Sequence, residues 1–160
     1  MLKFLSTIIF LLFTSITFGF AEILKDIKVD GNKRISKETI IVLGKIEVDT
    51  DYDSNKLNFN LKNLYNSNFF KDVNLNFDNS VLTINVVENP IIENIEITGI
   101  KRESITKKLT ESIILKNRMS FTENQLKKDI TLIKNILKTN GYYFAKVDSS
   151  LVKNDEVNSV

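Results

Sequence analysis

The side chains that could do chemistry in this 160-residue chain are mainly carboxylates, since the sequence contains no histidine and no cysteine. Those two residue types supply the commonest general base, the commonest metal ligand and the thiol nucleophile. The sequence therefore gives little support for an enzymatic function. Glu47, Asp49, Asp51 and Asp53 form an acidic run, but it lacks the spacing and the central glycine of a calcium loop. We therefore expect a protein that is not an enzyme, with no catalytic residue, no metal site and no cofactor.

The remaining groups of interest belong to the backbone, in stretches where apolar and polar residues alternate. Residues 82–87 and residues 94–98 both show this alternation, which is typical of a strand with one buried face. Pro90, the only proline, lies between the two stretches. Proline cannot donate to a sheet, and it keeps the preceding residue out of the helical conformation. We therefore interpret Glu88, Asn89 and Pro90 as the joint between two domains.

The first domain, residues 22–90, is expected to have the order strand, helix, helix, strand, strand. Ser36 is a good N-cap for the first helix, and Asp53 or Ser54 for the second. Asn68 is placed to end the second helix, because asparagine tolerates the left-handed conformation. The acidic run between the helices is expected to be a solvated connector. The predicted elements are strands at 23–30, 73–77 and 81–87, and helices at 37–46 and from 54 to about 67.

The second domain, residues 91–160, repeats this order. Residues 27–31 match residues 95–99, 68 positions later, and Ser36 matches Ser104, which we expect to cap a helix. Thr122 and Gln125 form a capping box for a second helix. Residues 147–152 are expected to form the next strand. A counterpart of residues 81–87 is missing, so we expect this domain to be incomplete at its last strand.

The first 21 residues are typical of a signal peptide. Lys3 precedes an apolar core at residues 4–13, and Gly19 and Ala21 place small residues before Glu22. We therefore expect cleavage before Glu22 and export of the rest of the chain. The alternative is an uncleaved membrane anchor, because no charge lies between Lys3 and Glu22.

Several separated motifs resemble the POTRA repeats of the BamA-type outer-membrane protein assembly factors. They are IKVDGNKRIS at residues 27–36, LYNSNFFKDV at 64–73, VVENP at 86–90 and GYYFAKV at 141–147. The resemblance covers nearly all of residues 22–160. It implies an N-terminal fragment of α+β class, with a signal peptide and two tandem β-α-α-β-β domains. Each domain would hold a three-stranded mixed sheet with two helices on one face, the second copy being truncated.

The resemblance also implies a function. The domains would lie on the periplasmic side of the outer membrane and lead to a membrane-embedded β-barrel that this sequence lacks. As a scaffold they would bind unfolded outer-membrane protein clients, assembly-complex lipoproteins and periplasmic chaperones. An exposed sheet edge can bind an extended chain through backbone hydrogen bonds. The edge residues implied are Asn74, Leu75, Asn76 and Phe77 in the first domain and Lys146, Val147, Asp148 and Ser149 in the second.

Other functions fit the sequence less well. An RNA-binding KH domain shares part of this element order, but the G-x-x-G loop between its helices is missing, so we expect no nucleic-acid partner. A related outer-membrane translocation or secretion protein remains an alternative, as does an anchored cell-division protein, although the second repeat argues against the latter. Four aromatic residues could form a ligand-stacking platform, but core packing is the more common role at a helix-to-strand turn. They are Phe69, Phe70, Tyr143 and Phe144.

Overall fold

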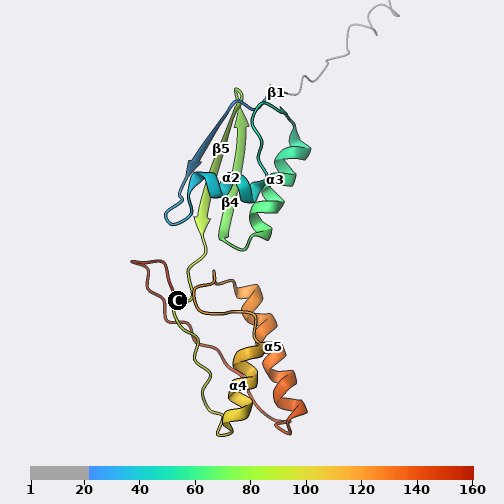
Figure 1. Ribbon diagram of the computed structural model, residues 1–160, viewed down its shortest axis with the longest axis vertical. Helices are drawn as coiled ribbons and strands as arrows, with labels where there is room; N and C mark the ends of the chain where they lie inside the picture. The colour runs from blue at the N-terminus through green and yellow to red at the C-terminus, as the bar shows by residue number, and fades with distance from the viewer. Residues whose placement is uncertain (1–21) are drawn as a thin grey trace, which may run out of the picture.

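The computed structural model of the chain describes residues 22–160 and shows two units in sequence (Figure 1). The predicted signal peptide, residues 1–21, lies outside the described residues. The first unit combines a sheet with two helices, and the second consists of two helices and long extended segments. Among residues 22–160, none of the helices is both long enough and apolar enough to cross a membrane.

The elements follow the predicted order closely in the first unit. After Asp30, the chain turns at Gly31 and enters the first helix. The bounds are β1 Glu22–Ile23, β2 Asp26–Asp30, α2 Lys37–Gly44, β3 Asp51–Tyr52, α3 Ser54–Asn66, β4 Phe70–Asp78, β5 Val81–Glu88, α4 Glu103–Ser112 and α5 Glu123–Thr139.

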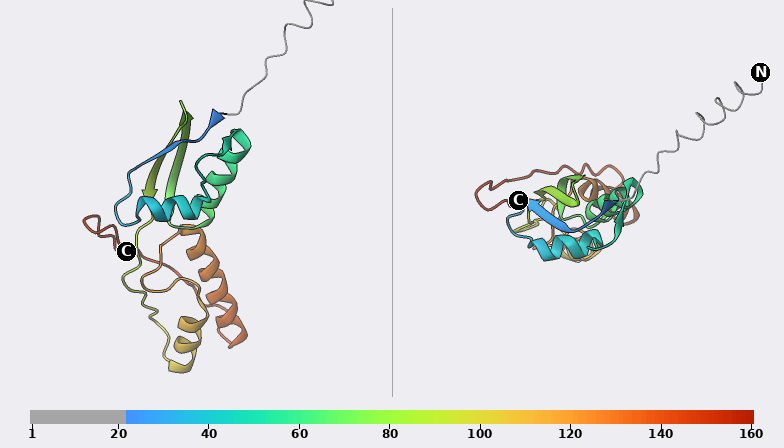
Figure 2. Two further views of the ribbon diagram at one scale, coloured as in Figure 1. Left: turned by 45° about the horizontal axis from the view of Figure 1, so that its top comes forward. Right: turned by 90° about the horizontal axis from the view of Figure 1, so that it is seen from above.

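The first unit is built around a three-stranded mixed sheet with the order β2-β5-β4. β2 runs parallel to β5, and β4 runs antiparallel to β5. Helices α2 and α3 lie on one face of this sheet (Figure 2). Alternate residues of β5 point toward the helices, and Leu82, Ile84 and Val86 are all buried there. Burying such side chains stabilises a fold by about 1.5–3 kcal/mol each.

Short polar side chains begin and end the elements where the sequence predicts. The Ser36 hydroxyl accepts a hydrogen bond from the Thr39 N–H at 3.2 Å, and Asp53 caps α3 through the Lys56 N–H at 2.8 Å. Asn68, after α3, has a φ of +60°. These contacts confirm the two caps and the left-handed turn.

The acidic connector differs from the prediction, because part of it forms a second, two-stranded sheet. β3 pairs antiparallel with β1, and Tyr52 of β3 is only 3% exposed. Its hydroxyl donates to Asn60 Oδ1 at 2.7 Å, and Asn60 in turn donates to the Gly44 carbonyl at 2.9 Å. Burial raises the pKa of Tyr52 to about 12. The tyrosine and asparagine therefore link the connector to both helices.

The second unit departs from the prediction in its sheet. The sequence predicts strands at residues 94–98 and 147–152, in a sheet that lacks its third strand, but neither segment forms a strand here. In the first unit, β2 and β4 both pair with the central strand β5, whereas neither of these segments has a central strand beside it. Ser104 was also the wrong cap: α4 begins at Glu103, after Arg102, without a side-chain cap hydrogen bond. Thr122, however, caps α5 through the Gln125 N–H at 3.2 Å, as predicted.

The core of the second unit consists of two small clusters. One contains Ile92, Leu115 and Phe121, and the other contains Ile105, Leu109 and Leu137. Tyr143 and Phe144 join neither cluster and are exposed, which corrects the prediction that they pack in the core. Five further apolar side chains are only half-buried, namely Ile95, Ile97, Leu126, Ile130 and Ile133.

The buried Tyr52 should make the stability of the first unit fall at high pH. Tyr52 keeps its proton in the folded state up to about pH 12, whereas it loses the proton near pH 10 when unfolded. The free energy of unfolding should therefore fall by about 1.4 kcal/mol per pH unit between these values and be unaffected below them. Urea unfolding of Tyr52→Phe should lack this part of the alkaline loss, and an unchanged pH profile would contradict the assignment.

The two units should differ in amide hydrogen exchange. Amides of β5 hydrogen-bond within a sheet, whereas residues 94–98 and 147–151 belong to no strand. Exchange from unpaired backbone needs little or no opening, while exchange from core strands needs a large one. Mass spectrometry of the chain should show slow exchange in β5 and fast exchange in both extended segments, and equal protection of the two units would contradict this expectation.

Candidate strand-binding edge and interdomain joint

Strand β4 forms one edge of the main sheet, since its neighbour is β5 and no other strand of that sheet pairs with it (Figure 1). The four predicted edge residues all lie within β4. Asn74 is opposite Asn85, and Asn76 is opposite Thr83. An edge strand presents backbone N–H and C=O groups that an extended chain can use.

The hairpin fixes which residues of β4 point outward. β4 and β5 are joined by the two-residue turn Asn79-Ser80, with Asp78 opposite Val81. The residues that flank such a turn form a hydrogen-bonded pair, and the pairs alternate along the ladder. Asn76 and Asn74 therefore bond to β5, whereas Leu75 and Phe77 direct their backbone groups away from it.

A side chain from α3 supports this alternation. The Tyr65 hydroxyl accepts a hydrogen bond from the Val73 N–H at 3.1 Å and donates to Asp72 Oδ1 at 2.9 Å. The Val73 amide thus points away from β5 and is covered by tyrosine. Leu75 and Phe77 are therefore the residues of this edge whose backbone groups point away from β5 and are not bonded to Tyr65.

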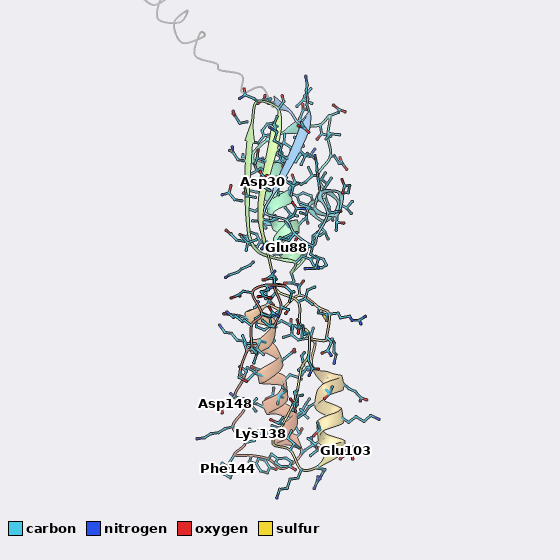
Figure 3. The ribbon with its side chains drawn as sticks, turned by 90° about the vertical axis from the view of Figure 1, so that its left-hand side faces the viewer. Asp30, Glu88, Glu103, Lys138, Phe144 and Asp148 are labelled. Carbon is cyan, nitrogen blue, oxygen red and sulfur yellow. The ribbon has the colours of Figure 1, made fainter. Side chains whose placement is uncertain are left out.

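The predicted edge of the second unit has no comparable geometry. Lys146, Val147, Asp148 and Ser149 form no strand, and all except Val147 are exposed. Val147 is half-buried and packs on the cluster of Ile105, Leu109 and Leu137. Figure 3 shows Asp148 beside α5 and Phe144 at the far end of the unit.

The joint is organised by the carboxylate of Glu88, the last residue of β5. Glu88 is 6% exposed, and its Oε1 accepts hydrogen bonds from the N–H groups of Lys33, Arg34 and Ile35 at 2.9, 3.0 and 2.9 Å. The Arg34 Nε lies 3.6 Å from Glu88 Oε2. One side chain therefore holds the turn between β2 and α2 against the end of the central strand.

The next residues connect the joint to both units. Asn89 donates from its backbone to the Phe69 carbonyl at 2.8 Å and from its side chain to the Asn68 carbonyl at 2.9 Å. The Pro90 carbonyl accepts from the Phe121 N–H at 2.8 Å. On the side of the second unit, Asn158 donates to the Glu88 carbonyl at 3.3 Å. All three predicted joint residues thus make specific contacts.

Several polar residues of the structure were not singled out from the sequence. Asn60 and Asp129 are buried within helices. Asp129 accepts from the Ile114 N–H at 3.0 Å and the Leu115 N–H at 2.8 Å. A polar residue on the apolar side of a helix is the only signal that could have identified them. Within residues 22–160, the structure brings together no group of three acidic, histidine or cysteine side chains that could hold a metal ion.

Comparison with known proteins gives consistent matches. The model of the POTRA family, described as "Surface antigen variable number repeat", matches residues 90–160. The outer membrane protein assembly factor BamA of Neorickettsia risticii is 30% identical over 150 residues, which cover 94% of this chain and 20% of the relative. BamA of Neisseria meningitidis serogroup B is 28% identical over 113 residues, covering 69% of this chain and 14% of the relative. The chain thus spans at most about a fifth of the length of these relatives.

Solved structures show the same fold at low identity. The N-terminal domain of Omp85 from Thermosynechococcus elongatus superposes with a TM-score of 0.54 at 14% identity, covering 81% of this chain and 56% of the other. POTRA domains 1–2 of the periplasmic domain of Omp85 from Anabaena superpose with a TM-score of 0.51 at 10% identity, covering 87% of this chain and 92% of the other.

The joint can be tested through Glu88. Replacing Glu88 by alanine leaves three backbone N–H groups without their acceptor, and we expect the free energy of unfolding of the first unit to fall by about 2–4 kcal/mol. Glu88→Gln keeps an acceptor oxygen and should cost less than half as much. Urea unfolding of both variants measures the difference, and a loss of less than about 1 kcal/mol for Glu88→Ala would contradict a stabilising role of the three hydrogen bonds.

Proposed function

Because the chain belongs to the POTRA-repeat family shared by BamA and Omp85 proteins, we propose that it is a periplasmic scaffold that binds unfolded outer-membrane protein clients for assembly at the outer membrane. The relatives are themselves named outer membrane protein assembly factors, and one matching structure is titled as a periplasmic domain. Assembly-complex lipoproteins and periplasmic chaperones are the further partners of this proposal.

The observation that carries the proposal is the outward backbone of β4 at Leu75 and Phe77. A client strand added there would use main-chain hydrogen bonds, which do not depend on the client's sequence. Transmembrane β-strands of different outer-membrane proteins share their alternation of apolar and polar residues rather than a common sequence. An edge that recognises backbone is therefore suited to many clients.

The composition of this edge supports the same conclusion. Natural proteins usually protect edge strands with charged residues, proline or a covering loop. Residues 73–77 of β4, VNLNF, contain neither a charge nor a proline. Leu75 and Phe77 are half-buried on the helix side, and Asn74 and Asn76 are exposed on the other face. The segment thus packs against the core on one face, and this supports the proposal that its outward backbone groups accept an added strand.

The proposal predicts the effect of removing one outward donor. Leu75→Pro deletes an N–H that points away from β5, so it should weaken binding of an unfolded outer-membrane strand peptide at least about tenfold, measured by fluorescence anisotropy. Leu75→Ala loses the same packing but keeps the donor, and it should bind nearly as well as the parent chain.

A second control separates binding from folding. The Asn74 N–H bonds to β5 rather than to solvent, so Asn74→Pro should destabilise the sheet itself. If Leu75→Pro is folded by circular dichroism and binds the peptide with unchanged affinity, clients do not pair with β4 and the proposed site is wrong.

A further inference from the structure

The hydroxyl of Tyr65 lies at the edge of the main sheet, where α3 packs along β4 (Figure 1). It accepts a hydrogen bond from the Val73 N–H at 3.1 Å. Its single hydrogen can bond to Asp72 Oδ1 at 2.9 Å or to the Val73 carbonyl at 3.3 Å. One phenol oxygen therefore lies within hydrogen-bonding distance of both backbone groups that Val73 directs away from β5.

A neighbouring strand would use the same two groups of Val73. In an antiparallel ladder, the opposite residue accepts the N–H and donates to the C=O. Its carbonyl oxygen would have to lie about 2.9 Å from the Val73 nitrogen, where the tyrosine oxygen already lies at 3.1 Å. The two oxygens cannot occupy this place together, so a strand can pair with Val73 only if Tyr65 moves away.

Moving Tyr65 away would gain little. Pairing at Val73 would form two main-chain hydrogen bonds, whereas the phenol would leave its bonds to Val73 and Asp72. An exchange of similar numbers of hydrogen bonds has a small net effect. The tyrosine is 40% exposed, so its ring would also lose the contacts that bury the rest of it. We therefore expect Tyr65 to stay in place when a strand binds beside it.

The part of β4 before Val73 is also poorly suited to pairing. The register of β4 against β5 shifts between Phe70 and Asp72, and such an irregularity disrupts the ladder locally. Asp72 is exposed, and a charged side chain is one of the usual means of protecting a strand edge. Tyr65 therefore lies at the border between the regular part of the edge and an irregular, charged part.

The hairpin turn limits the edge at its other end. β4 ends at Asp78, which lies opposite Val81 across the turn. Among residues 22–160, no hydrogen bond from another segment reaches the backbone of Leu75 or Phe77. Between the tyrosine and the turn, the edge therefore offers the N–H and C=O groups of these two outward residues.

We propose that Tyr65 determines how long a client segment β4 can bind. The client pairs with Leu75 and Phe77, and its pairing stops before Val73. This role rests on the proposed function, because it concerns the strand that the same edge accepts. It assigns the length of that strand to a side chain of α3, outside the edge itself.

A short paired segment has a consequence for the client. A transmembrane β-strand has about 9–11 residues, so the edge would pair with only a part of it. Outward backbone groups and apolar side chains both recur at every second residue, so a client shifted by two residues fits the edge equally well. The edge would therefore bind one client strand in several registers instead of fixing its whole length.

Two peptides test the length limit. One has nine residues that alternate between apolar and polar, as in an outer-membrane strand, and the other is its central five residues. Extension at both ends makes the comparison independent of strand direction. By NMR titration, the long peptide should bind the parent chain no more than about threefold more tightly, because it offers three registers two residues apart.

Tyr65→Ala should remove the length limit. Without the phenol, the Val73 N–H and C=O become available to the long peptide, which should bind the variant at least about tenfold more tightly than the parent chain. The five-residue peptide should bind both chains equally. Amide exchange at Val73 should slow when the long peptide binds Tyr65→Ala, and it should stay unchanged when the peptide binds the parent chain.

Phe59→Ala is the matched control. Phe59 is also an exposed aromatic residue of α3, but Lys45 Nζ at the end of α2 lies 5.9 Å from the centroid of its ring. Its replacement removes an aromatic side chain from the same helix without freeing a backbone group of β4. Both peptides should bind this variant as they bind the parent chain, and circular dichroism shows whether each variant is folded.

The parent chain alone can overturn the proposal, if the nine-residue peptide binds it at least about tenfold more tightly than the five-residue peptide. Equal affinities of Tyr65→Ala and Phe59→Ala for the long peptide would overturn it as well. The proposed function fails differently. If Leu75→Pro binds the five-residue peptide as the parent chain does, or if neither peptide binds the parent chain, clients do not pair with β4 at all.

Discussion

The first unit depends on the double pairing of β5. Both other strands of the main sheet bond to it, one parallel and one antiparallel, and the inward side chains of β5 form the middle of the core. The parallel partner is distant in sequence, since Asp26 lies opposite Val81. The helices and the hairpin can form from local contacts, but the three-stranded sheet exists only when β5 lies between its neighbours.

The carboxylate at the end of β5 extends this dependence to the joint. Glu88 orders the turn that leads into α2, and the residues directly after it bond to both units. A single strand therefore determines the sheet, the entry to the first helix and the beginning of the connection. The second unit shows the converse case, in which helices α4 and α5 are formed while their extended neighbours remain without a ladder.

The sequence predicted the features whose cause is local. Ser36, Asp53 and Thr122 cap helices because a short polar side chain reaches the nearby backbone, and this can be identified from adjacent residues. The pairing of β1 with β3 could not be predicted in this way, because neither two-residue strand has a periodic pattern. Ser104 failed as a cap although Ser36 succeeded, since α4 begins one residue before it.

The candidate edge was only partly predictable for a related reason. Alternation in residues 73–77 indicates a strand, but it does not show which amides point outward. The direction of each amide follows from the hairpin turn at Asn79-Ser80, and the hydrogen bond from the Val73 N–H to the Tyr65 hydroxyl supports it. In the second unit, Tyr143 and Phe144 were predicted to pack in the core because, like Phe69 and Phe70, they lie at a helix-to-strand turn. That prediction was wrong, since both are exposed in a unit that has no sheet to cover them, and aromatic residues at a turn do not show whether such a sheet is present.

The parallel arrangement of β2 and β5 also has a mechanical consequence. β2 lies near the start of the described chain, β5 leads directly into Pro90, and the two strands run side by side in the same direction. Tension applied between these two points would pull the neighbouring strands in opposite directions along their length. Their hydrogen bonds would then be sheared together rather than unzipped one after another. The first unit is thus arranged to resist stretching along the line of the chain while it remains open at its side.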